Sequence, residues 1–259
     1  MPTVAWMVTA SLVATRLVVV LTFLPVLGLR NVPTITRVLF AFGLTLVVTP
    51  GVPSGPIPSS LSALTMGIGG EVLMGILIGG TIRLAFDSLA LAGQLMDGQT
   101  GQAAAVAYDP MLETTQGPLS LLAALMAGGL FVGADMHLRV LLAIADSFSM
   151  VPPGAVADPL SGALPWFDFG GAMIQTGFRL AAPTVALIFI LNVFVAVITR
   201  LAPQLNLYFS FGFIITIFGG EFIWMTALPM VLTEHQAFVQ RALDLLPEVI
   251  GRAGGVYGR

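Results

Sequence analysis

Long runs of apolar residues without a two-residue alternation limit what this chain can fold into. Six such stretches lie at about 4–29, 36–50, 61–92, 119–151, 170–200 and 205–232. A transmembrane helix needs about 20 predominantly apolar residues, whereas a strand of a transmembrane barrel alternates apolar and polar positions over about ten. Since 57% of the 259 residues are hydrophobic and only 9% are charged, the sequence predicts an all-α protein of integral membrane-type helical hairpins.

Proline, glycine and serine gather between these stretches and predict where the hairpins turn. They are dense in PGVPSGPIPSS (50–60) and in VPPGAVADPLSGALP (151–165), and Pro203 interrupts RLAPQLN (200–206). Two of the apolar stretches are too long for one perpendicular crossing of about 30 Å at 1.5 Å per residue, so we expect them to tilt or kink. We expect one helical domain over 1–232, followed by an amphipathic helix and tail over 233–259.

The segment EHQAFVQRALDLLPEVI (234–250) has the pattern of an amphipathic helix. Its apolar residues fall at helical spacing, at Phe238, Ala242, Leu245, Leu246 and Val249. Two interpretations stay open at this point. The helix packs against its own protein, or it lies on a membrane surface or a partner. Pro247 is expected to end or bend it.

Ionisable residues inside the apolar stretches are the most informative departure from simple membrane spans. They are Arg16, Glu71, Asp135, Arg139, Asp146, Arg179 and Glu221. A charge at the centre of a span costs about 2.5–3.5 kcal/mol on the translocon scale, so these side chains are expected to face protein or water. Either they pair within the chain, as the four-residue spacing of Asp135 and Arg139 allows, or some of them face partner subunits or a wet passage.

Two small-xxx-small patterns predict close contacts between helices. Gly75 with Gly79 in GILIG, and Gly129 with Gly133 in GLFVG, leave room for helix backbones to approach one another. We expect close packing at these glycines, either within the chain or between chains.

The polar stretch GQLMDGQTGQAAAVAYDPM (93–111) interrupts the apolar pattern with flexible, small-residue sequence. Irregular backbone at membrane depth persists only where protein buries it or water lines it, because an unsatisfied amide in lipid costs several kcal/mol. The stretch is therefore expected at a water-filled passage, inside an assembly, or outside the bilayer. Its small side chains suit a movable obstruction, and the alternative is an ordinary polar hairpin loop in water.

No motif in the sequence supports catalysis. Cysteine is absent, His137 and His235 belong to no H-E-x-x-H pattern, and neither a G-x-S-x-G elbow nor a phosphate-binding loop occurs. We expect no enzyme, no cofactor and no metal site. No basic patch exists that would neutralise phosphates, so nucleic acid is not expected as a partner. The candidate from another class is a secondary transporter that binds a small solute beside Glu71, Asp135 or Glu221.

Three segments carry motifs of a known family. The first, EVLMGILIGGTIRLAFDSLALAGQLMDGQTGQAAAVAYDP (71–110), opens a glycine-rich helix with a glutamate and closes a small-residue run in Asp-Pro. The second, DSFSMVPPG (146–154), ends in Pro-x-Gly, and the third (177–213) contains Arg-x-Ala-Pro-Gln-x-Asn. Together they resemble the flagellar biosynthesis protein FliR family and its virulence-secretion counterpart SctT, over about residues 10–230.

The resemblance implies a non-enzymatic core subunit of the type III export gate in the bacterial inner (cytoplasmic) membrane, at the flagellar basal body. Such a subunit would form a pore with FliP-type and FliQ-type proteins, beside FlhB-type and FlhA-type proteins, and unfolded export substrates would pass through that pore. The segment RLAPQLNLYFSFGF (200–213) favours the flagellar branch, whereas LMDGQ (95–99) favours the virulence branch. The flagellar role is preferred, with the virulence counterpart as the alternative.

The resemblance also implies site residues. The loop that closes in Asp-Pro, at about 98–116, would contribute a plug within the pore. Its assigned residues are Gly98, Gln99, Gly101, Gln102, Ala103, Ala104, Ala105, Tyr108, Asp109, Pro110 and Met111. The helix break of the family motif comprises Arg200, Pro203, Gln204 and Asn206.

Overall fold

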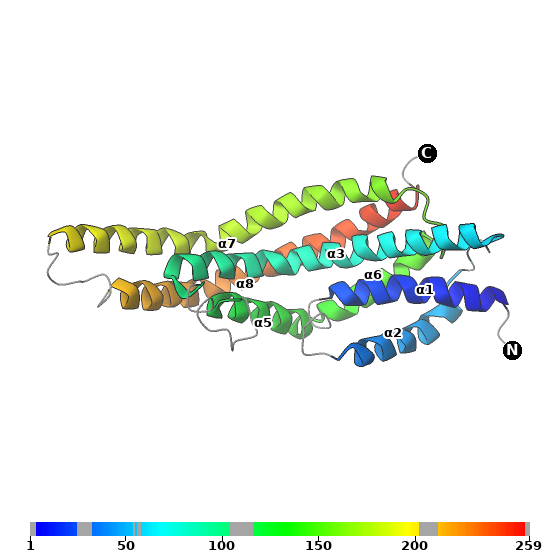
Figure 1. The fold of residues 1–259 in the computed structure, drawn as a ribbon, viewed down its shortest axis with the longest axis horizontal. Coiled ribbons are helices and arrows are strands. Elements are labelled where there is room, and N and C mark those ends of the chain that lie inside the picture. The colour runs from blue at the N-terminus through cyan, green and yellow to red at the C-terminus, as the bar shows by residue number, and fades with distance from the viewer. Residues whose placement is uncertain are drawn as a thin grey trace. The chain divides into compact units, whose positions relative to one another are not determined.

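The computed structural model describes residues 4–24, 33–53, 55, 58–103, 116–201 and 212–256. Within these residues the fold is helical and contains no strand (Figure 1), so the all-α prediction is confirmed. The elements are α1 (Val4–Phe23), α2 (Thr34–Val48), the short 3-10 helix η1 (Thr49–Gly51), α3 (Leu61–Thr100), α5 (Pro118–Gly133), α6 (Met136–Met150), α7 (Pro159–Leu201) and α8 (Phe213–Ala253).

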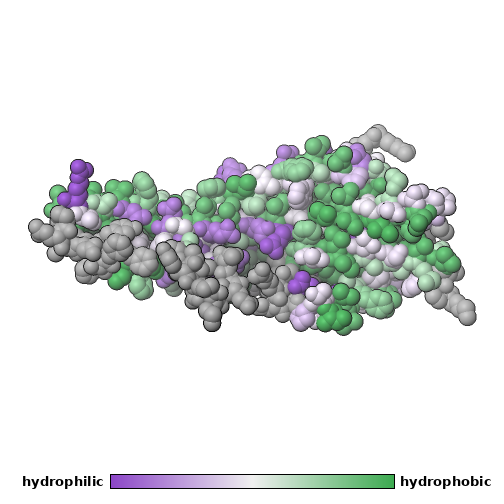
Figure 2. Space-filling model, in the orientation of Figure 1, coloured by the Kyte–Doolittle hydropathy of each residue, from purple (hydrophilic) through white to green (hydrophobic). Residues whose placement is uncertain are grey.

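The described helices have the length and composition of membrane spans. Helices α1, α3, α7 and α8, and α2 together with η1, are each long and apolar enough to cross a membrane. Helices α5 and α6 meet the same criteria only as a pair with a break between them, which brings the number of candidate spans from 5 to as many as 6. Figure 2 shows apolar side chains, in green, over much of one face. Such a surface needs lipid or neighbouring protein to cover it.

Three helices extend beyond the predicted boundaries. Helix α3 continues to Thr100, so the first part of the polar stretch 93–111 is helical and not irregular. Helix α7 begins at Pro159, inside the predicted 151–165 connection, because proline fits the first turn of a helix, where its missing N–H has no partner to lose. Helix α8 runs without interruption through 232–233 and past Pro247 to Ala253.

The chain divides into two compact units. Unit 1 comprises Met1–Ala85, Phe131–Gly171 and Val239–Arg259, and unit 2 comprises Phe86–Leu130 and Ala172–Phe238. Helices α3, α7 and α8 each contribute one part to unit 1 and another part to unit 2. Unit 1 therefore contains α1, α2 and α6, while most of α5 belongs to unit 2.

In unit 1, α1 packs closely against the first half of α3 through the predicted glycines. A Cβ atom on Gly75 would lie 2.7 Å from Val19 Cβ and 3.1 Å from the Arg16 carbonyl oxygen, and one on Gly79 would lie 2.9 Å from Phe23 Cβ. The Val20 side chain is fully buried at this contact. The predicted close packing at Gly75 and Gly79 is confirmed, and it occurs within the chain.

Gly129 and Gly133 differ from this first pair, because within the described residues nothing lies within 4 Å of a Cβ atom built on either.

Because a Cβ atom at Gly75 would crowd α1, Gly75→Ala is expected to destabilise the protein by about 1–3 kcal/mol through overpacking. Gly129→Ala should be neutral or stabilising by up to about 1 kcal/mol, since alanine has the higher helix propensity. Thermal unfolding of both variants in detergent checks the contrast. Equal destabilisation by the two would contradict the packing described here.

The C-terminal part of α8 packs against its own protein, which confirms one of the two open interpretations. Ala242, Leu246 and Val249 are fully buried. A Cβ atom on Gly162 of α7 would lie 2.8 Å from the Val249 carbonyl oxygen, and the Asp158 N–H donates to the Ala253 carbonyl oxygen at 2.9 Å. The amphipathic face of residues 239–253 therefore belongs to the core of unit 1.

The start of α7 is capped beside this contact. Ser161 donates from Oγ to Asp158 Oδ2 at 2.5 Å and from its backbone N–H to Oδ1 at 3.2 Å. The hydroxyl hydrogen bond and then the backbone one lower the pKa of the exposed Asp158 carboxyl below its ordinary value. The cap explains why the helix begins at Pro159.

Candidate functional site: the loop anchors and the embedded charges

The described residues on both sides of the proposed plug are held together by one buried carboxylate. Asp97, near the end of α3, is only 2% exposed. Its Oδ1 accepts the Leu119 N–H at 3.0 Å, and its Oδ2 accepts the Ser120 N–H at 2.9 Å. These are amides of the first turn of α5, which have no partner inside the helix, and a negative charge there also favours the helix dipole. Asp97 thus caps α5 from a distant part of the sequence.

Glycines permit this close approach. A Cβ atom on Gly117 would lie 2.3 Å from Asp97 Cγ, and one on Gly93 would lie 2.5 Å from Ser120 Cα. Ser120 Oγ also donates to the Gly117 carbonyl oxygen at 2.9 Å, which closes the first turn of α5. Any larger side chain at 117 would push the carboxylate away from the amides it caps.

A second contact lies where the chain leaves α3. Gly101 has a φ of 79°, in the left-handed region that favours glycine, and it ends the helix. The buried Gln102 then donates from Nε2 to Oε1 of Glu221 at 3.4 Å. A Cβ atom on Gly220 would lie 2.9 Å from Thr100 Cγ2, so α8 approaches this end of α3 closely. Both flanks of the loop are therefore fixed on helices of unit 2.

The structure describes only part of the predicted plug and of the predicted helix break. Gly98 and Gln99 belong to the last turn of α3, and Gly101, Gln102 and Ala103 follow it. Arg200 is exposed in the last turn of α7. The remaining assigned residues lie outside the described residues: Ala104, Ala105, Tyr108, Asp109, Pro110, Met111, Pro203, Gln204 and Asn206.

In unit 1, two of the seven embedded charges form a buried ion pair. Arg16 of α1 and Glu71 of α3 both have fully buried side chains, with Arg16 Nε 2.6 Å from Glu71 Oε2. Arg16 Nη2 donates to Glu71 Oε1 at 3.1 Å, and the same oxygen accepts the Gly154 N–H at 2.8 Å. The expectation that these charges face protein is confirmed for this pair.

The remaining donors of Arg16 reach the C-terminal end of α6. Nη1 donates to the carbonyl and hydroxyl oxygens of Ser147, each at 3.0 Å, and Nη2 donates to the Val151 carbonyl oxygen at 3.1 Å. With the two bonds to Glu71, all donors of the guanidinium are used. Its Cζ also lies 4.3 Å from the centre of the Phe148 ring. Arg16 therefore joins α1, α3 and α6, and at Val151 it satisfies a carbonyl that the end of α6 leaves open.

The other embedded charges have different surroundings. Asp135 precedes α6 with a φ of 53°, and no ion pair joins it to Arg139 within the described residues, so that suggested pairing is wrong. Arg139 donates from Nη1 to Gln240 Oε1 instead. Asp146 and Arg179 are exposed.

The histidines occupy apolar surroundings. His235 is buried, its Nδ1 lies 3.4 Å from Ser88 Oγ, and its ring meets Phe86 edge-on. His137 packs against Phe131. No group of three metal-binding side chains occurs in the described part of the chain. The contacts of Asp97 and Arg16 are structural, since Asp97 caps a helix and Arg16 joins three helices.

Sequence reasoning did not find the partners of Asp97 and Arg16. The sequence pattern indicates no partner for Asp97 and does not match Arg16 with Glu71, because both contacts join residues far apart in sequence. The one available signal was local. Gly117-Pro118 has the glycine and proline expected at the first positions of a helix, without a side-chain cap of its own.

Comparisons with known proteins agree with this architecture. The family described as "Bacterial export proteins, family 1" matches residues 7–242. The flagellar biosynthetic protein FliR of Escherichia coli strain K12 is 26% identical over 236 residues, which cover 91% of this chain and 90% of that protein. FliR of Caulobacter vibrioides is 27% identical, with 87% and 92% covered. The Yop proteins translocation protein T of Yersinia pestis is 30% identical over 64% of each chain. These relatives are named for flagellar biosynthesis and protein translocation, not for an enzymatic activity.

Proposed function

This chain belongs to family 1 of the bacterial export proteins, and we propose that it is a core subunit of a type III export gate that conducts unfolded proteins. It forms the pore with FliP-type and FliQ-type subunits and contributes a plug from about residues 98–116. The observation that carries the plug is the pair of fixed flanks in unit 2, where Asp97 caps α5 and Gln102 contacts Glu221.

The exposed surface supports assembly with other subunits. Large apolar side chains such as Phe189 and Phe222 are more than half exposed. FlhB-type and FlhA-type proteins are the further partners in the same apparatus. The gate lies in the bacterial inner membrane at the base of the flagellum.

The share of this chain that aligns with each relative favours the flagellar role over the virulence one. The two FliR relatives from Escherichia coli and Caulobacter align with at least 87% of this chain, against 64% for the Yersinia translocation protein. The virulence counterpart has the same proposed role in a different apparatus, so it stays the alternative.

Co-expression tests the assembly. We expect the chain to purify in a stable hetero-oligomer with a central pore when FliP-type and FliQ-type proteins are present, and poorly without them, because its exposed apolar surface then has no protein cover. Size-exclusion chromatography with mass determination and electron microscopy measure this. A monomer or homodimer that transports a small solute in liposomes would support a secondary transporter instead and end the export proposal.

Deletion of residues 103–107 tests the plug. The assembled gate is expected to form in normal yield but to leak ions, because the proposed obstruction is removed while the described anchors of its flanks at Asp97 and Gln102 are kept. Conductance of the purified gate in planar bilayers measures the leak. The matched control is Gly129→Ala, which also changes a small residue of unit 2 and should leave conductance unchanged. A gate that stays closed after the deletion contradicts the plug assignment.

A further inference from the structure

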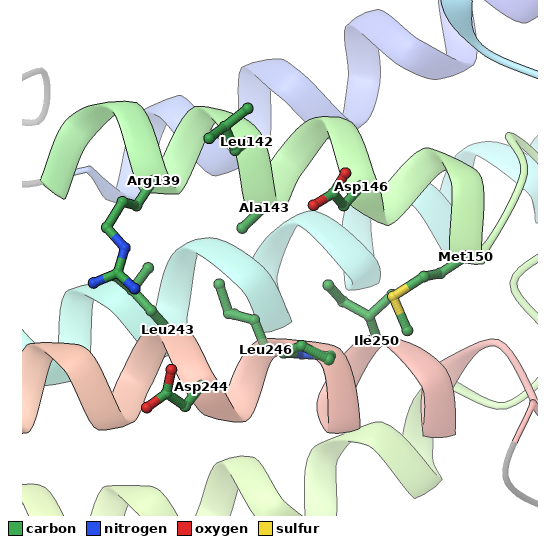
Figure 3. A pocket seen from close by; sticks show the side chains of 10 residues that line it. Arg139, Leu142, Ala143, Asp146, Met150, Leu243, Asp244, Leu246 and Ile250 are labelled. Atoms are coloured by element: carbon green, nitrogen blue, oxygen red, sulfur yellow. The ribbon is translucent and has the colours of Figure 1, made fainter.

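A groove lies between α6 and the C-terminal part of α8, both in unit 1, and contains no residue of the proposed plug or of its described anchors. Figure 3 shows its two walls, with Arg139 extending from α6 toward α8, which carries Asp244 and Leu246; Leu142 and Asp146 of α6 also line the groove. Its volume is about 240 Å³. At about 30 Å³ per water molecule that is room for about eight waters, comparable with one long side chain.

The groove contains two carboxylates that form no ion pair among the described residues. Asp146 and Asp244 are exposed, and neither forms an ion pair with any cation among the described residues. Arg139 is the single basic residue in the lining, and its Nη1 already donates to Gln240 Oε1. The lining therefore carries two negative charges and one positive charge, and its net charge is negative.

Pro247, which also lines the groove, adds a backbone acceptor. Proline has no N–H, so the helical hydrogen bond from residue 247 to the Leu243 carbonyl oxygen cannot form, although α8 continues to Ala253. An acceptor without its helical donor favours a donor from outside the helix.

The apolar lining sets the kind of occupant. Leu142 is 63% exposed at the rim, while Leu246 is fully buried beneath. A hydrated ion would gain nothing from these side chains, whereas the methylene stem of an arginine or lysine packs on apolar surface and places its charge beside the carboxylates. An apolar helix that carried such a charge into the membrane would need an acidic partner.

We propose that this groove receives an arginine or lysine side chain from a helix of a neighbouring subunit, which contacts Asp146 and Asp244 while apolar residues around it pack on Leu142. This inference rests on the proposed function only in requiring that the chain assembles with other subunits. It assigns a docking surface to unit 1, whereas the described flanks of the proposed plug belong to unit 2.

A photo-crosslinker at Leu142 identifies the occupant. The complete gate is purified with p-benzoylphenylalanine at this position, irradiated, and the joined peptide is sequenced by mass spectrometry. We expect a peptide of a different chain that carries an arginine or lysine next to apolar residues. A peptide from a second copy of this chain, a peptide without a basic residue, or an adduct with lipid alone would each overturn the proposal.

Charge removal tests the contact energetically. The double variant Asp146→Asn/Asp244→Asn is expected to lose the crosslinked subunit at a salt concentration that the native gate withstands, with about a tenfold drop in co-purified subunit, the equivalent of about 1.4 kcal/mol. Since both side chains are exposed, the fold should not change, which circular dichroism checks. Glu248→Gln, on the same helix but outside the groove, is the control and should have no effect.

The two proposals fail in different ways. If no hetero-oligomer forms even with the native chain, the export-gate proposal fails. If the native gate forms and the double variant keeps all its subunits at every salt concentration, only the docking surface is refuted.

Discussion

Arg16→Ala is expected to lower the free energy of unfolding by about 3–5 kcal/mol, the largest effect of any single substitution considered for this protein. The change leaves the fully buried Glu71 carboxylate without its cation. It also removes the donors that satisfy the carbonyl oxygens of Ser147 and Val151. The Ser147 carbonyl oxygen keeps the Val151 N–H as a donor, but the Val151 carbonyl oxygen loses its donor in a buried place, so the penalty of an unsatisfied buried acceptor adds to that of the unpaired charge.

Thermal unfolding in detergent measures this loss, and a fall in the midpoint of about 10 °C is expected. Arg252→Ala is the matched control, since Arg252 and Glu248 form an ion pair with side chains 43% and 47% exposed. An exposed pair of this kind contributes at most about 0.5 kcal/mol. Equal effects of the two substitutions would show that Arg16 does not hold unit 1 together.

A double-mutant cycle separates the ion pair from the rest of the network. Arg16→Ala/Glu71→Ala is expected to cost less than the sum of the two single changes, because removal of both charges leaves neither one buried and alone. The double variant should remain less stable than the native protein, since the Gly154 N–H and the Val151 carbonyl oxygen lose their partners.

Asp97→Asn is expected to have the second-largest effect, a loss of about 2–3 kcal/mol. The asparagine amide has the same size, but its NH₂ group would face one of the two N–H groups, of Leu119 and Ser120, that the carboxylate now accepts. Two donors would then oppose each other in a buried place, and the negative charge at the start of α5 would be lost. The near-isosteric change therefore tests the charge and not the packing.

Two measurements check this second prediction. Thermal unfolding reports the lost cap, and conductance of the assembled gate tests the proposed plug beside Asp97, with a leak as the expected result. Asp158→Asn is the control, because Asp158 caps the start of α7 with local, exposed bonds. A stable, closed Asp97→Asn gate would contradict the role of Asp97 as the anchor of the loop.

Much of the fold was predicted from local pattern. The long apolar runs predicted the helices and excluded an alternating barrel, and the spacing of Gly75 and Gly79 predicted one close helix contact. The spacing within 238–249 predicted an amphipathic helix, but only the structure shows that its apolar face packs on its own protein. Each of these is a property of residues a few positions apart, because helical periodicity repeats every 3.6 residues and appears directly in the sequence.

Family membership, too, was accessible from sequence, because its motifs are local. The segments at 71–110 and 177–213 carried the resemblance, and the family match over residues 7–242 confirms it.

The tertiary structure alone decided which polar groups meet. Arg16 and Glu71 lie 55 residues apart, and Asp97 reaches Ser120 across 23 positions. Packing also extended α3 through the polar residues up to Thr100, because Asp97 on that last part of the helix finds its partners on α5. Sequence shows that a buried charge needs a partner, since the cost of isolation is local, but the identity of the partner depends on which helix faces pack together.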